Sequence, residues 1–138
     1  MELEQILRQH RKALVVAAER AVAEARRHSH QLPDKTQFNR LISVCGEATC
    51  AEEIENYLRY QASRQSQPWP RESCDLVIAE LAAPLQALTN ELGQHREGDR
   101  DRARVAAWRL YAVFLARAST YARAVASSDR RERHGRAR

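Results

Sequence analysis

Glycine and proline stand at only a few points of the chain, and those points divide it into long runs of helix-forming residues. The sequence of 138 residues holds four glycines and four prolines. The main breaks lie at residues 30–33 (HQLP), at Gly46, at residues 67–70 (QPWP) and at Gly93. The runs between them are rich in alanine, leucine, arginine, glutamate and glutamine, which favour helix. The sequence therefore predicts an all-α fold, a compact bundle of about five helices.

Apolar residues recur at spacings of three and four within each run, which is typical of amphipathic helices. Thr49 and Glu52 have the spacing of a capping box, and Pro84 predicts a kink in the fourth helix. Gly46 and Gly93 are expected to end the second and fourth helices. The predicted helices cover residues 2–30, 36–45, 49–63, 71–92 and 101–127.

The last helix and the residues after it differ sharply in character. Apolar side chains, among them Trp108, Phe114 and Tyr121, surround residues 101–127 on every side, so this helix is expected to be central or shared with a neighbouring subunit. Residues 129–138 hold five arginines against two acids and almost no apolar side chain. We therefore expect one helical domain over residues 1–128 and a disordered basic tail over 129–138.

Positive charge is concentrated in the last third of the chain. Residues 1–95 hold 11 basic and 13 acidic side chains, a net charge of −2, whereas residues 96–138 hold 12 arginines and 5 acids, a net charge of +7. A basic element of this kind favours a polyanionic partner. No run of apolar residues approaches the length of a membrane span, and the first residues lack the apolar core of a signal peptide. We expect a cytoplasmic protein that does not enter a membrane.

The pattern of reactive residues does not indicate an enzyme. Three cysteines and five histidines are scattered without a zinc-ligand spacing, so no metal or other cofactor is expected. There is no nucleophile motif and no phosphate-binding glycine loop. No histidine follows an arginine at the spacing used by a well-known class of small helical ribonucleases. We expect a protein that binds a partner, with no small-molecule substrate.

Binding to a nucleic-acid backbone requires only cationic groups at phosphate spacing. Arg40 has no acid four residues away, so it is free to bind, whereas Arg59 can pair with Glu55. Tyr57 is expected on the core side of its helix, with Tyr60 and Arg64 on the flank, and Trp69 is expected to plug the junction of the third and fourth helices. The candidate contacts to RNA phosphates are Lys35, Arg40, Arg59, Arg64 and, as a weaker candidate, Arg117.

Two short segments together resemble a known family. The segment TQFNRLISV at residues 36–44 and the segment YLRYQASR at residues 57–64 resemble the paired signature of the small helical subunit of type III CRISPR–Cas effector complexes. A closing helix rich in aromatic residues and alanine, here residues 108–124, completes the pattern. The residues that match the two signatures are Thr36, Gln37, Arg40, Leu58, Tyr60 and Arg64.

The resemblance implies a specific role in antiviral defence. Several copies of the chain would stack head to tail within a ribonucleoprotein complex, beside its other subunits. They would hold the duplex of guide RNA and target RNA by its backbone, while pairing with the guide reads the sequence. The subunit itself would be non-catalytic, and the subtype of the complex stays open.

A second class of function stays open beside this one. A small helical DNA-binding regulator, or a protein-interaction module, is also compatible with a short basic helical chain. A regulator requires a helix-turn-helix, and residues 45–50 (CGEATC) are short enough to form its turn. The helix that follows begins with Glu52 and Glu53, however, and their charges would repel phosphates.

Overall fold

The computed structural model describes residues 2–136, which form five α-helices and no strand. The all-α prediction is therefore confirmed. In chain order the helices are α1 (Leu3–Arg27), α2 (Lys35–Glu47), α3 (Ala51–Ser63), α4 (Arg71–Leu92) and α5 (Glu97–Arg136). None of the helices in this described part of the chain combines the length and the apolar character needed to cross a membrane.

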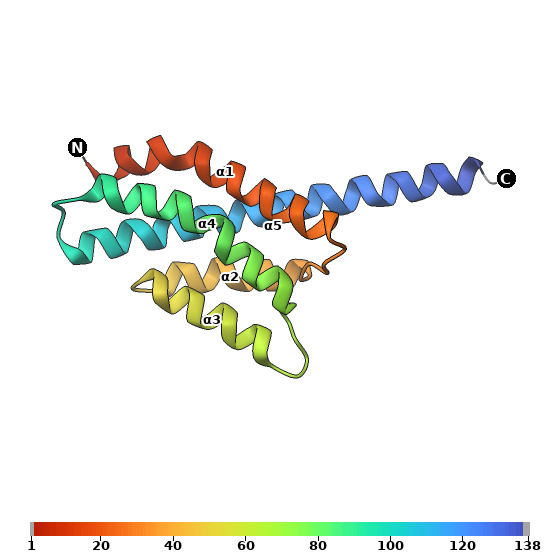
Figure 1. Ribbon diagram of the computed structural model, residues 1–138, viewed down its shortest axis with the longest axis horizontal. Coiled ribbons are helices and arrows are strands. Elements are labelled where there is room, and N and C mark those ends of the chain that lie inside the picture. Colours follow the sequence, from red (N-terminus) through yellow and green to blue (C-terminus); the bar gives the residue numbers. More distant parts are fainter. Residues whose placement is uncertain (1, 137–138) are drawn as a thin grey trace.

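Helix α5 runs through the middle of the bundle and touches all four other helices. Helices α1 and α4 pack together on one side of it, while the α2–α3 hairpin covers another side (Figure 1). Within the described residues α1 makes no contact with α2 or α3. The expectation of a central fifth helix is confirmed for its first two-thirds, where its buried residues lie.

The core is built around two aromatic residues of α5. Trp108 and Tyr111 are almost fully buried, and their rings meet edge to face with centroids 5.6 Å apart. The Tyr111 hydroxyl donates a hydrogen bond of 2.6 Å to the backbone carbonyl of Val77 in α4. Burial raises the pKa of this hydroxyl far above its usual value, so Tyr111 stays neutral and joins α5 to α4.

Trp69 lies in the loop between α3 and α4, as expected for a packing plug. Its side chain is fully buried and meets the ring of Phe38 in α2 edge to face, with centroids 5.4 Å apart. The loop thereby fixes α2 beside the start of α4. This prediction is confirmed, and stacking of Trp69 on a bound base is excluded in this conformation.

Some of the predicted helix ends are wrong by a few residues. Gly46 lies within the last turn of α2 and does not end it, since the helix caps at Ala48. Gly93 does cap α4, with a φ of 38° that favours glycine. The capping box of Thr49 and Glu52 is not formed, because the backbone N–H and the hydroxyl of Thr49 both donate to Glu53. Asp34 is the side-chain cap of α2, accepting a 3.1 Å hydrogen bond from the backbone N–H of Gln37.

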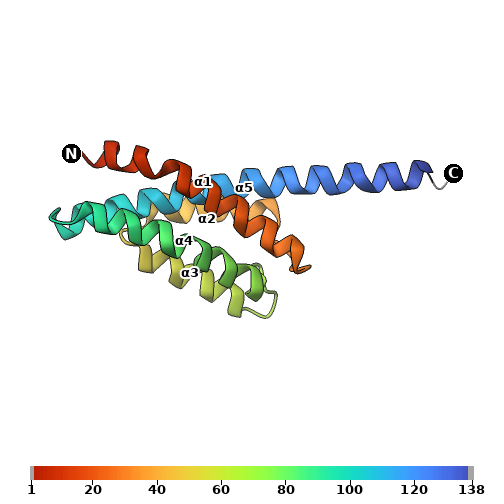
Figure 2. The same ribbon diagram turned by 45° about the horizontal axis from the view of Figure 1, so that its top comes forward.

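The predicted disordered tail over residues 129–138 is wrong for the residues that the structure describes. Helix α5 continues through Arg136, while residues 137 and 138 lie outside the described part. Adding residues to an existing helix avoids the cost of nucleation, and arginine and glutamate are good helix formers. Asp129 and Arg133 are also spaced by four residues, which favours the helix. The end of α5 therefore projects alone from the bundle (Figure 2).

Candidate nucleic-acid interface

Arg40 of α2 and Arg64 at the end of α3 both lie close enough to Tyr57 for their charges to act on its hydroxyl. Burial raises the pKa of the half-buried Tyr57 hydroxyl, and the positive charges of Arg40 and Arg64 both oppose that rise. Tyr60, which is 62% exposed, lies one helical turn before Arg64. We call Arg40, Tyr57, Tyr60 and Arg64 the hairpin surface.

The two arginines of the hairpin surface keep their charges available. Within residues 2–136 neither Arg40 nor Arg64 has a carboxylate within ion-pair distance. The Arg64 guanidinium donates one hydrogen bond of 3.1 Å to the side-chain oxygen of Gln61, and both arginine residues are exposed. An arginine with most of its five donors free is suited to bind phosphate oxygens.

Lys35 lies at the open end of the same hairpin. It is the first residue of α2, is exposed, and directly follows the capping residue Asp34. Because α2 and α3 are joined at their other ends by Ala48–Cys50, the start of α2 and the end of α3 both lie at this open end. Lys35 is therefore placed to extend the positive charge of the hairpin surface.

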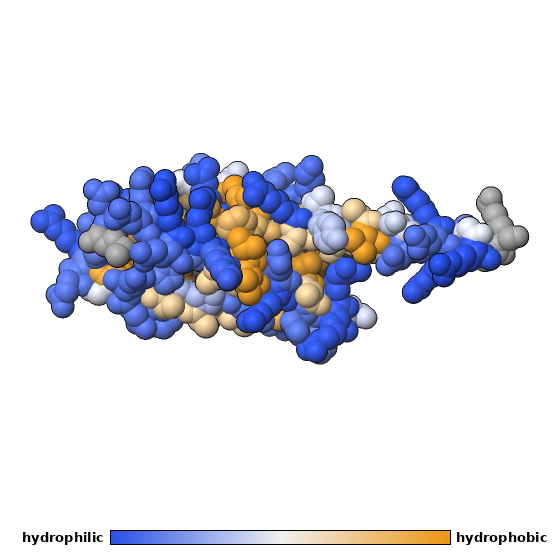
Figure 3. Space-filling model, turned by 90° about the horizontal axis from the view of Figure 1, so that it is seen from above, coloured by the Kyte–Doolittle hydropathy of each residue, from blue (hydrophilic) through white to orange (hydrophobic). Residues whose placement is uncertain are grey.

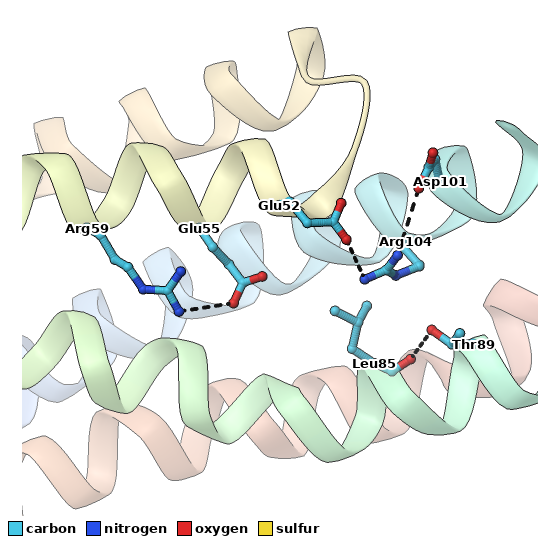
Figure 4. Close-up of polar contacts among 7 residues, drawn as sticks. All are labelled: Glu52, Glu55, Arg59, Leu85, Thr89, Asp101 and Arg104. Atoms are coloured by element: carbon cyan, nitrogen blue, oxygen red, sulfur yellow. Dashed lines mark hydrogen bonds and ion pairs between the residues drawn. The ribbon is translucent and has the colours of Figure 1, made fainter. Parts of the chain in front are cut away.

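Arg59 does not belong to the hairpin surface. Its guanidinium lies 3.6 Å from a carboxylate oxygen of Glu55, and the pair faces α4 (Figure 4). The prediction that Glu55 would engage Arg59 is confirmed. The charge of Arg59 also acts on Cys74 in α4, which places it on the other flank of α3.

Arg117 is separated from the other candidates as well. It lies on α5 at the rim of an apolar groove between α1 and α5, with a volume of about 560 Å³. We call this the α1–α5 groove. Arg117 shares this groove with residues of α1, and no residue of the hairpin surface lines it. The structure thus brings together Arg40 and Arg64, places Lys35 nearby, and separates Arg59 and Arg117.

A charged network that the sequence did not reveal offsets the negative charge of Glu52 at the start of α3. Arg104 of α5 lies 3.1 Å from Glu52 and 3.8 Å from Asp101 (Figure 4). Backbone hydrogen bonding at the start of the helix, followed by the charge of Arg104, lowers the pKa of Glu52. Glu52 and Arg104 are 52 residues apart in the sequence, so no local spacing could identify the pair.

A polar pocket of about 640 Å³ opens beside the end of the hairpin. Four glutamines and one arginine, Gln31, Gln37, Gln65, Gln67 and Arg123, contribute to its lining. Arg123 donates to the backbone carbonyl of Pro33, which joins α5 to the loop between α1 and α2. Gln37 lies in the first turn of α2, and Gln65 directly follows Arg64. Glutamine amides both donate and accept hydrogen bonds, so the pocket can bind polar edges of a ligand.

The buried cysteines are chemically quiet. Burial raises the pKa of Cys45 to about 12 and that of Cys74 to about 11, in each case against the charge of a nearby arginine. Both are therefore thiols at neutral pH, and a thiol is a poor nucleophile and a poor metal ligand. Within residues 2–136 no three His, Cys, Asp or Glu side chains form a group that could hold a metal ion.

The fold and the surface describe an all-helical domain that presents arginine and tyrosine on one hairpin. The chain matches no protein-family model, no curated protein and no solved structure. Its candidate interface is therefore defined by its own geometry and charges.

Proposed function

We propose that this chain is a non-catalytic small subunit of a type III CRISPR–Cas effector complex and that its hairpin surface binds RNA by the backbone. Its partners in this role are the guide RNA and target RNA, the other subunits of the complex and further copies of itself. The observation that carries the proposal is that Arg40 and Arg64, one from each segment of the resemblance, are both exposed near Tyr57 and have no carboxylate partner within residues 2–136.

The chemistry of the hairpin surface favours backbone binding without sequence readout. Two guanidinium groups free of carboxylates supply donors for phosphate oxygens, and Lys35 adds a third positive charge at the open end. The exposed ring of Tyr60 is available to stack on a base, and stacking tolerates every base type. Binding by such groups depends strongly on salt and weakly on sequence.

The test is the double substitution Arg40→Ala with Arg64→Ala, measured by fluorescence anisotropy with labelled RNA at several salt concentrations. Affinity should fall by about tenfold or more for every RNA sequence, because two phosphate contacts are lost. The slope of log affinity against log salt should become shallower by about 1.4 to 1.8 for two contacts. The effect should be the same in the assembled complex.

The matched control is Arg8→Ala with Arg20→Ala, which removes the same charge from exposed positions of α1. In the described structure α1 does not touch the hairpin, so this variant should bind RNA almost as the unchanged protein does. If both double variants lose the same affinity and slope, binding follows net charge and the assignment of the hairpin surface is wrong. If neither variant changes binding, the proposed function is wrong.

A DNA-binding regulator is the second candidate, and one observation favours it. The connection between α2 and α3 consists of Ala48–Cys50, the length of turn that a helix-turn-helix uses. Against it, α3 begins with Glu52 and Glu53, and Arg104 compensates only the first of them. The same assay with duplex DNA separates the two candidates, since a regulator would prefer a particular duplex over RNA.

A further inference from the structure

The α1–α5 groove is an apolar surface that no other part of residues 2–136 covers. Among residues 2–136 only three large apolar side chains are exposed, namely Val16, Tyr60 and Tyr121. Tyr121 lines the groove and is 73% exposed, and Val16 lies on α1 next to the groove residue Val15. Figure 3 shows apolar residues gathered in a band between charged residues on one face of the molecule. An apolar surface of this kind marks an interaction site.

An apolar stripe continues beyond the groove along α5. Phe114, Ala118, Tyr121 and Val125 follow one another at spacings of four, three and four, which is the spacing of a helix that packs along another helix. Ala122 is the last buried residue of α5, and Val125 is half-buried. The stripe therefore belongs partly to the groove and partly to residues 124–136, which we call the C-terminal extension.

Charge on the C-terminal extension is sorted by face. Asp129 and Glu132 follow Val125 at spacings of four and three, so both acids lie on the same face as Tyr121 and Val125. Successive residues of a helix are rotated by about 100°. Arg130, Arg131 and Arg133 therefore lie away from that face, whereas Arg136, eleven residues after Val125, returns to it. The extension thus presents a stripe that is apolar, then acidic, and that ends in an arginine.

The rim of the α1–α5 groove carries the complementary charge. Arg117 of α5 and Arg26 of α1 both line it, against a single acid, Glu19. Neither Arg26 nor Arg117 has a carboxylate within ion-pair distance in residues 2–136. The groove of one copy therefore offers an apolar floor and two free arginines, which match the apolar and acidic stripe of another copy.

We infer that two copies of this chain associate through α5 helices that lie antiparallel, with the C-terminal extension of each seated in the α1–α5 groove of the other. With the two Arg123 positions opposite one another, Val125 of each copy lies beside Tyr121 of the other. The same register places Asp129 of each copy opposite Arg117 of the other. A parallel arrangement would instead place like charges side by side, which is unfavourable.

The lengths agree with this pairing. In this register residues 124–132 of the C-terminal extension face the groove, and they span about 12 Å at a rise of about 1.5 Å per residue. The α5 side of the groove runs from Phe114 to Ala122, about 12 Å by the same measure. Because the contact is reciprocal, it closes at two copies. It is therefore distinct from the head-to-tail row that the sequence resemblance implies.

The first test is sedimentation of the full chain without RNA. We expect a dimer at micromolar concentrations. Tyr121→Glu with Val125→Glu should weaken association by at least about tenfold, because two charges enter the apolar contact. The matched control is Tyr60→Glu, which changes the exposed tyrosine of α3 and should leave association unchanged. An unchanged protein that stays monomeric, or a dimer that only Tyr60→Glu disrupts, would overturn the inference.

The second test uses two charge-reversed variants and their mixture. In a dimer of two Arg117→Glu copies, the introduced negative charge lies opposite the native Asp129. In a dimer of two copies with Asp129→Arg and Glu132→Arg, the introduced positive charges lie beside the native Arg117. Each variant alone should therefore associate at least about tenfold more weakly. Mixed in equal amounts, they should form a heterodimer. In this heterodimer the substituted position 117 of the first variant faces the arginines introduced in the second variant. The unchanged Arg117 of the second variant faces the native acids of the first. A mixture that stays monomeric would overturn the pairing.

These tests do not require RNA. The residues altered to break the dimer lie on α5, while the proposed RNA contacts Arg40 and Arg64 lie on α2 and at the end of α3. Circular dichroism of each variant checks that the bundle is folded. Loss of association with binding to a short RNA retained would identify the groove as the dimer contact, and retained association with RNA binding lost would concern the hairpin surface alone.

Discussion

Replacement of Trp69 tests whether this residue holds the bundle together. Its side chain is fully buried between the hairpin and α4, and its ring meets Phe38 edge to face. Removing about 200 Å² of buried aromatic surface at about 25 cal/mol per Å² corresponds to about 5 kcal/mol. Partial relaxation around the cavity lowers this figure, so Trp69→Ala should cost about 4 kcal/mol of unfolding free energy.

Trp69→Phe refines the same prediction. The indole N–H of Trp69 is buried and has no hydrogen-bond partner within the described residues. Phenylalanine loses part of the packing but also removes this unsatisfied donor, and the two effects oppose one another. We expect Trp69→Phe to cost about 1 to 2 kcal/mol, well below the cost of Trp69→Ala.

Urea unfolding followed by far-UV circular dichroism measures both variants. The midpoint should fall in the order unchanged protein, Trp69→Phe, Trp69→Ala, with little change in the slope of each transition. RNA affinity measured on the folded fraction should not change, because Trp69 is buried. A Trp69→Ala variant that is almost as stable as the unchanged protein but binds RNA poorly would refute the packing role.

Two further predictions concern the polar contacts of α5. Tyr111→Phe should cost about 1 kcal/mol in urea unfolding, because it removes the hydrogen bond to the Val77 carbonyl and keeps the ring; a neutral result would mean that the bond adds nothing. The lowered pKa of Glu52 contributes stability that is present above the pKa of an unfolded glutamate, near 4.3, and is lost as the pH falls through the lower folded value. Glu52→Gln should therefore be slightly less stable than the unchanged protein at pH 7, and the difference should shrink as the pH falls below about 4.3; a difference that does not shrink would exclude the ionised carboxylate as its source.

Local patterns predicted most of the fold because they act within a few residues. The break at residues 30–33, the proline before α4 and the left-handed Gly93 each limit a helix through backbone geometry alone. The pairing of Glu55 with Arg59 follows from a spacing of four on one helix, and the structure contains it. The prediction of a disordered tail was wrong because it used only the composition of residues 129–138. These residues follow a helix that already exists, and α5 continues through Arg136.

The candidate site was predicted less well, because its residues meet through tertiary packing. Spacing placed Arg40 and Arg64 on exposed faces of two helices, but only the hairpin brings both close to Tyr57. Arg117 has the same chemistry and lies at the α1–α5 groove. The sequence therefore indicates which arginines are free to contact phosphate, but it does not show which of them lie on the same surface.

The hairpin surface and the α1–α5 groove are separate, and this affects how they act together. The hairpin surface and the α1–α5 groove share no residue and lie against different sides of α5, since α1 touches neither α2 nor α3 in the described structure. Pairing of two copies through the groove would therefore leave Arg40 and Arg64 exposed on each copy. A dimer would present two hairpin surfaces to one RNA, and linked sites bind more tightly than separate ones when both can be reached. Disrupting the dimer through Tyr121 and Val125 should then weaken binding to a long RNA and leave binding to a short one unchanged.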